Sequence, residues 1–208
     1  MKKILFIVMF FLSLIILEQN TKAYDCPDPS YTYRVVVMDI GGCPVTVHFC
    51  YKCSPLGLTE TWIEVQRIDI PKNCRIDSIM TFEEVMAQVR MNFFAFGGYY
   101  VSSLCWPQGI IPCGNLPYNY YTVTIKTPRC MKKYNDNGNI WYFICPNAPT
   151  CSVTYKICWD PVLGIRILET GNGIPSPGDS TCMNVEMQPD PEKEHYSSCF
   201  KVGSPCDE

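Results

Sequence analysis

Two cysteines separated by two residues, Cys50 and Cys53, are the first group in the chain that could do chemistry. In a thiol–disulfide oxidoreductase, this spacing lets one thiolate attack a disulfide while the other resolves the product, usually at the start of a helix. Here the pair ends a predicted strand, and the turn-forming sequence Ser54-Pro55-Leu56-Gly57 follows. We therefore expect two structural cysteines that pair elsewhere, with redox chemistry as the alternative.

The same stretch could also bind a metal. His48, Cys50 and Cys53, with Cys74 as a fourth ligand, would form a Cys3His set of the kind that zinc takes. Thiols of an exported protein are usually oxidised, however. A similar strand later in the chain has Lys156 at the position of His48. A position that also accepts lysine is expected to face solvent, so we predict no metal and no other cofactor.

Residues for nucleophilic or acid/base catalysis are sparse. The chain has two histidines, His48 and His195, and no Gly-x-Ser-x-Gly motif. The paired carboxylates Glu83 and Glu84 lie in the first turn of a predicted helix, where acidic side chains interact favourably with the helix dipole. We predict no catalytic residue, and a hydrolase would need carboxylates that converge across a cleft.

A group of aromatic residues surrounds a loop-rich insertion. Tyrosine and tryptophan combine a flat apolar body with a polar tip, which suits protein or glycan surfaces. The alternative is that these rings pack beneath the loop and against the helix. The predicted binding surface consists of Tyr99, Tyr100, Trp106, Tyr118, Tyr120 and Tyr121.

The cysteine spacing itself recurs along the chain. Cys43 and Cys50 enclose Pro-Val-Thr-Val-His-Phe, and Cys151 and Cys158 enclose Ser-Val-Thr-Tyr-Lys-Ile. A third cysteine follows each pair after 24 residues, so three cysteines recur at an offset of 108 residues. This predicts an internal duplication. Because the first and last cysteine of each strand point to opposite faces, they should bond to different neighbours.

The N-terminal residues predict export. Lys2 and Lys3 precede an apolar run from residue 4 to 17, and Ala23 ends a small-residue cleavage site, as in a bacterial secretory signal peptide. Cleavage after Ala23 would leave 185 residues with 14 basic and 19 acidic side chains, a net charge of −5. This charge argues against nucleic acid as a partner, and no later apolar run is long enough to span a membrane.

The number of cysteines, 14 and all after the signal, predicts up to seven disulfides in an oxidising compartment. Their pairing cannot be deduced from spacing. The candidates are Cys26, Cys43, Cys50, Cys53, Cys74, Cys105, Cys113, Cys130, Cys145, Cys151, Cys158, Cys182, Cys199 and Cys206.

Alternating apolar residues predict strands over residues 31–40, 43–50, 61–70, 120–126, 140–145, 151–158 and 162–169, with an irregularity near Gln66. The turn sequence at 135–139 predicts a hairpin. One amphipathic helix is predicted from a capping box at Thr81 and Glu84 to Gly97 and Gly98. Its apolar face, which must cover a sheet, comprises Phe82, Val85, Met86, Val89, Phe93 and Phe96.

These elements predict a mostly β fold of two related, disulfide-clipped antiparallel units, sandwich-like, with one α-helix between them. The expected divisions are a cleaved signal peptide (1–23), a first β unit (24–78), the helix (79–98), the insertion (99–119), and a second β unit with a tail (120–208). We expect a secreted, non-enzymatic protein with a binding or structural role at the cell surface or outside the cell. The alternative is an exported enzyme. A protein or glycan partner fits this expectation, and the sequence leaves the ligand and the oligomeric state open.

Overall fold

The computed structural model describes residues 26–54, 60–74, 76, 79–94, 104–105, 112–113, 120–178, 182 and 196–206. Within them lie ten strands and one long helix. They are β1 (Thr32–Ile40), β2 (Cys43–Cys53), β3 (Glu60–Ile70), α2 (Phe82–Asn92), β4 (Tyr121–Pro128), β5 (Cys130–Asp136), β6 (Asn139–Ile144), β7 (Thr150–Asp160), β8 (Gly164–Thr170), β9 (Ile174–Ser176) and β10 (Phe200–Lys201). The mostly β fold expected from the sequence is therefore confirmed.

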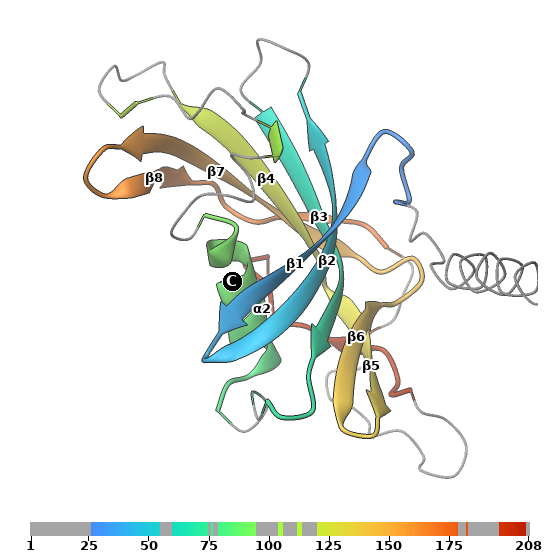
Figure 1. Cartoon of the computed structure of the whole chain (residues 1–208). Coiled ribbons are helices and arrows are strands. Elements are labelled where there is room, and N and C mark those ends of the chain that lie inside the picture. Colours follow the sequence, from blue (N-terminus) through green and yellow to red (C-terminus); the bar gives the residue numbers. More distant parts are fainter. Residues whose placement is uncertain are drawn as a thin grey trace, which may run out of the picture.

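All ten strands belong to one curled sheet, with β3 at its centre (Figure 1). One edge of β3 pairs with β2, which pairs in turn with β1. The other edge is shared: Glu60–Glu64 pair with β4 in parallel, and Arg67–Ile70 pair with β6 antiparallel. The β4 branch continues to β7, β8 and β9, and the β6 branch continues to β5 and β10. The parallel β3–β4 pair is a departure from the antiparallel pairing expected throughout.

A β-bulge lies where β3 changes partners. His48 pairs with Arg67 and Phe49 pairs with Val65, so Gln66 has no residue opposite it in β2. This is the irregularity that the broken alternation predicted. A bulge bends its strand and increases the local twist. The bend explains how one strand edge can serve two diverging branches of the sheet.

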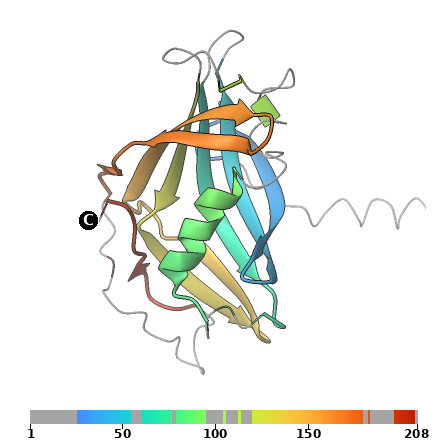
Figure 2. The ribbon, with the colours of Figure 1, turned by 90° about the vertical axis from the view of Figure 1, so that its left-hand side faces the viewer.

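The core lies between the concave face of the sheet and α2, which Figure 2 shows in front of the strands. Val85, Met86 and Val89 of α2 are buried there. Phe93, just after the helix, meets Phe49 of β2 edge to face with ring centroids 5.1 Å apart. Phe82 stacks on Tyr142 of β6 at 4.0 Å. The helix and the residue after it thus pack against β2 and β6, on either side of β3.

The start of α2 follows the predicted capping box. The Thr81 hydroxyl accepts the Glu84 N–H at 3.2 Å, and the Glu84 carboxylate accepts the Thr81 N–H at 2.7 Å. The helix ends at Asn92, earlier than expected. Phe93, at the C-cap, keeps helical dihedral angles and continues the buried stripe of Val85 and Val89, as expected, and Phe94 after it is also buried. Phe96, Gly97 and Gly98 lie outside the described residues.

Seven disulfides link all 14 cysteines, each of them within the described residues. The links are Cys26–Cys50, Cys43–Cys74, Cys53–Cys105, Cys113–Cys158, Cys130–Cys182, Cys145–Cys199 and Cys151–Cys206. The first and last cysteine of each eight-residue repeat do bond to different neighbours, as predicted. Each link typically stabilises a fold by about 2–4 kcal/mol.

The pairing does not repeat at the 108-residue offset. Cys43 bonds to Cys74, but its counterpart Cys151 bonds to Cys206, and Cys182 bonds to Cys130. The recurrence of cysteine spacing is therefore not matched by a recurrence of disulfide pairing. The two strands do share the alternation of buried and half-exposed residues, and both have a register shift at the same place, His48/Phe49 and Lys156/Ile157. The duplication itself stays a prediction.

Candidate binding surface on the outer face of the sheet

The register of five strands assembles two parallel rows of side chains on the face of the sheet opposite α2. The first row runs Val35–His48–Arg67–Phe143–Lys132, and the second runs Val37–Thr46–Asp69–Trp141–Tyr134. These residues alternate with the buried ones of each strand, so they share the outer face. Opposite residues on one face lie within contact distance. We call these two rows, with Tyr33 and Tyr196, the outer-face cluster.

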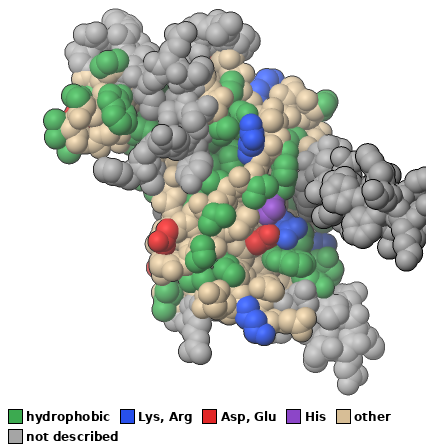
Figure 3. All heavy atoms as spheres, viewed as in Figure 1, with side chains coloured by type: hydrophobic (Ala, Val, Ile, Leu, Met, Phe, Trp, Pro, Cys, Tyr) green, Lys and Arg blue, Asp and Glu red, His purple; other side chains and the backbone are tan. Residues whose placement is uncertain are grey.

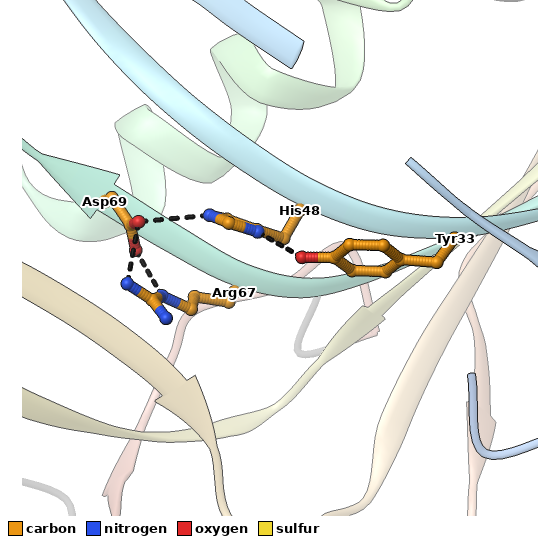
Figure 4. A network of polar contacts seen from close by, with 4 residues as sticks. All are labelled: Tyr33, His48, Arg67 and Asp69. Carbon is orange, nitrogen blue, oxygen red and sulfur yellow. Dashed lines mark hydrogen bonds and ion pairs between the residues drawn. The ribbon is translucent and has the colours of Figure 1, made fainter. Parts of the chain in front are cut away.

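A polar network forms the middle of the outer-face cluster (Figure 4). His48 Nε2 lies 3.0 Å from Asp69 Oδ2, and His48 Nδ1 makes a short hydrogen bond with the Tyr33 hydroxyl. Arg67 donates to the same carboxylate from Nε and, at 2.8 Å, from Nη2. The side chains of His48, Arg67 and Asp69 are 14%, 18% and 20% exposed. The network is thus half-buried at the surface, and its members hold one another in place.

Asp69 lies at His48 Nε2 and the Tyr33 hydroxyl lies at Nδ1. Both ring nitrogens are engaged, and both Asp69 oxygens accept hydrogen bonds. His48 lies on the outer face, as expected from Lys156, but Tyr33 and Asp69 leave its side chain only partly exposed. Figure 3 shows this histidine beside acidic and basic side chains, with hydrophobic ones around them.

The cysteines near His48 serve the fold. Cys50 bonds to Cys26 and Cys53 bonds to Cys105, so the two do not form a CxxC disulfide with each other. Cys74, the fourth residue of the considered zinc set, bonds to Cys43. A cysteine in a disulfide has no thiolate to offer a metal or a substrate disulfide. Among the described residues, no group of three or more His, Cys, Asp and Glu side chains could hold a metal ion.

Aromatic rings surround the Arg67 guanidinium at the other end of the cluster. The guanidinium carbon lies 4.9 Å from the Trp141 ring centroid and 4.8 Å from that of Phe143. Tyr134 stacks on Trp141 at 5.2 Å and meets Tyr196 at 4.6 Å. Lys132 lies 4.6 Å above the Tyr196 ring, which is 41% exposed. Cation–π contacts of this kind contribute about 0.5–1 kcal/mol each at exposed sites.

A hollow of about 370 Å³ lies beside these rings. It is lined by Gln66, Lys132, Phe143, Ile144 and Tyr196. Gln66 is the bulge residue of β3, and its side-chain Nε2 is buried without a hydrogen-bond partner among the described residues. A buried donor without a partner costs about 1–3 kcal/mol.

The aromatic surface predicted from the sequence falls mostly outside the described residues. Tyr99, Tyr100, Trp106 and Tyr118 lie there. Of the remaining two, Tyr121 is half-buried and packs against the core. Tyr120 has Lys156 of β7 at 5.0 Å from its ring centroid. Tyr120 and Tyr121 are therefore at least partly engaged in packing, the alternative considered for these rings.

Sequence reasoning missed the outer-face cluster, although part of its signal was present. In β6, Ile140 and Tyr142 point to the core, so Trp141 must point outward, and an outward tryptophan is a recognised mark of binding. The partners of Trp141 come from β3 and β5, and the pairing of β3 with β6 cannot be read from spacing.

No family model, no curated protein and no solved structure matches this chain. In the part of the chain that the structure describes, no helix has the length and hydropathy needed to cross a membrane. The disulfides are typical of proteins in an oxidising, extracellular environment.

Proposed function

We propose that this is a secreted, non-enzymatic protein that binds a protein partner through its outer-face cluster. Tyrosine, tryptophan and arginine dominate the residues that carry binding energy at protein interfaces. Here Tyr134, Trp141, Tyr196 and Arg67 occupy one connected surface. That surface is the observation on which the proposal rests.

The cluster is already ordered before any partner arrives. Arg67 is held by two hydrogen bonds to Asp69, and Asp69 is held by His48. Ordering a long side chain on binding costs about 0.5–1.5 kcal/mol, and a side chain that is already ordered avoids this cost. The disulfides add rigidity beneath it, since Cys50 of β2 and Cys145, which follows β6, are both linked.

A protein partner fits better than a glycan because of how the rings are arranged. A sugar stacks on an open aromatic face. Trp141 has Tyr134 stacked on it and Arg67 over its ring, so its faces are engaged within the cluster. The cluster therefore offers ring edges and the polar tips of tyrosines. These groups suit the mixed polar and apolar surface of a protein.

The test uses the oxidised, secreted protein, immobilised and exposed to extracellular proteins of the cells that export it. Retained proteins are quantified by mass spectrometry for the parent, for Trp141→Ala, and for Trp159→Ala as a control. Trp159 is 40% exposed on β7, outside the cluster. We expect one protein that is retained by the parent and the control and reduced about tenfold or more by Trp141→Ala, the loss of a hot-spot residue.

Two results would contradict the proposal. One is equal loss with both tryptophan variants, which would place binding elsewhere or indicate general destabilisation. The other is retention of no protein at all together with saturable binding to a glycan array.

A further inference from the structure

A second hollow, of about 590 Å³, lies on the opposite side of the sheet from the outer-face cluster. It is lined by α2, by β7, by Thr170 at the end of β8, by residues 171–173 after it and by the segment at Cys206. Val153 and Tyr155 are buried at its floor, and Met91 and Asn172 are exposed at its rim. Its lining mixes apolar side chains with polar ones, the latter being Arg90, Tyr155, Thr170 and Asn172.

The lining includes a buried arginine. Arg90, in the last turn of α2, is only 7% exposed, and its Nη1 has no hydrogen-bond partner among the described residues. Burial lowers the pKa of the guanidinium, and Tyr155 and Glu83 partly offset this effect. Arginine stays charged even so. A buried charge is costly unless it is paired, and the Arg90 guanidinium, part of which lines the hollow, keeps one donor that no described residue accepts.

We infer that this hollow binds a small monocarboxylate with an apolar body. A guanidinium is a planar fork of donors that matches a carboxylate, and the apolar body would lie on Val153, Ala87 and the Tyr155 ring. Glu83 lies close enough to act on Arg90, and its negative charge disfavours a dianion such as phosphate. The inference does not depend on the outer-face cluster.

A purely structural role for Arg90 is the competing explanation. A cation in the last turn of a helix interacts favourably with the helix dipole. That role needs no ligand, so it predicts that adding a carboxylate changes nothing at Arg90.

The test is an NMR titration of the isotope-labelled, oxidised protein that follows the Arg90 Nε–H signal. Benzoate is the probe, benzamide is its uncharged counterpart, and inorganic phosphate is the alternative anion. We expect saturable shifts with benzoate at a dissociation constant of about 1 mM or below, near −4 kcal/mol or stronger. Benzamide and phosphate should bind at least about tenfold more weakly, which corresponds to 1.4 kcal/mol.

Variants locate the site. In the variants, benzoate binding is followed through the backbone amide signals of Val153 and Gly171. Arg90→Gln should weaken benzoate binding about tenfold or more. The control Arg34→Gln, which changes an exposed arginine of β1, should leave benzoate binding unchanged. If Arg90→Gln fails to fold, the comparison of benzoate with benzamide binding to the parent protein still tests whether the hollow recognises a carboxylate. No saturable shift with benzoate, equal binding of benzamide, or binding of phosphate in its place would each overturn the inference.

Discussion

The role inferred for His48 differs between the sequence and the fold, because the fold shows which side chains contact its ring. In the sequence it stands two residues before a CxxC, where metal binding is the first idea to test. In the fold, Tyr33 and Asp69 bond to its two ring nitrogens, and Asp69 also binds Arg67. His48 therefore connects β1 to β3 and, through Asp69, helps to hold the Arg67 guanidinium against the aromatic rings.

The coupling of His48 and Asp69 is a testable consequence. A double-mutant cycle with His48→Ala and Asp69→Ala, measured by urea unfolding, should give an interaction free energy of about 1–2 kcal/mol, since both side chains are half-buried. The matched control is the more exposed pair Glu64 and Lys126, 3.3 Å apart, which should give about 0.2–1 kcal/mol. Equal coupling in both cycles would mean that the network adds nothing beyond an ordinary surface ion pair.

Tyr155 should ionise late. Burial raises its pKa above the ordinary value of 10.0, and the positive charge of Arg90 opposes this only in part. Because the folded state holds the proton more tightly than the unfolded state, the contribution of Tyr155 to stability is present below pH 10 and is lost as the pH rises beyond it. The measurement is a pH titration of the absorbance at 295 nm for the parent and for Tyr155→Phe. The difference between the two curves reports the ionisation of Tyr155, and its midpoint should lie above pH 10. A midpoint below pH 10 would show that burial does not control this hydroxyl.

At the scale of elements, the alternation of apolar residues gave most strands to within about two residues, since a strand with one buried face must alternate. The bulge at Gln66 was predicted from the broken alternation, which is a local pattern. The hairpin turn was predicted equally locally from its turn residues, of which Asn137 and Gly138 have positive φ. The parallel pairing of β3 with β4 and the short strands β9 and β10 did not. They depend on contacts between residues far apart in sequence, which no local pattern encodes.

The two faces of the sheet should respond differently to loss of a phenylalanine ring. Phe93 is fully buried between α2 and β2, so Phe93→Ala should lower the free energy of unfolding by about 3–5 kcal/mol. Phe143 lies half-exposed in the outer-face cluster, so Phe143→Ala should cost clearly less. Urea unfolding of both variants measures the difference. A larger loss for Phe143→Ala would place the core on the wrong face.

At the scale of the whole molecule, the disulfides connect segments that the sheet alone would leave apart. Cys145, after β6, is joined to Cys199, and Cys151 of β7 is joined to Cys206, so the C-terminal segment is attached to both branches of the sheet. This attachment places Tyr196 in the outer-face cluster and Cys206 beside the hollow at Arg90. The sequence predicted that disulfides exist, but the choice among pairings is made by the fold, because only cysteines whose Cα atoms lie within about 7 Å can bond.

The disulfide pairing is therefore the most direct test of a cross-linked scaffold that carries both surfaces. The measurement is mass spectrometry of the secreted protein, alkylated without reduction and then digested to map the linked peptides. The structure predicts no alkylated cysteine and seven links, including Cys26–Cys50, Cys53–Cys105 and Cys151–Cys206. A Cys50–Cys53 bond, or alkylation of either residue, would contradict this account and would favour a thiol-dependent function instead.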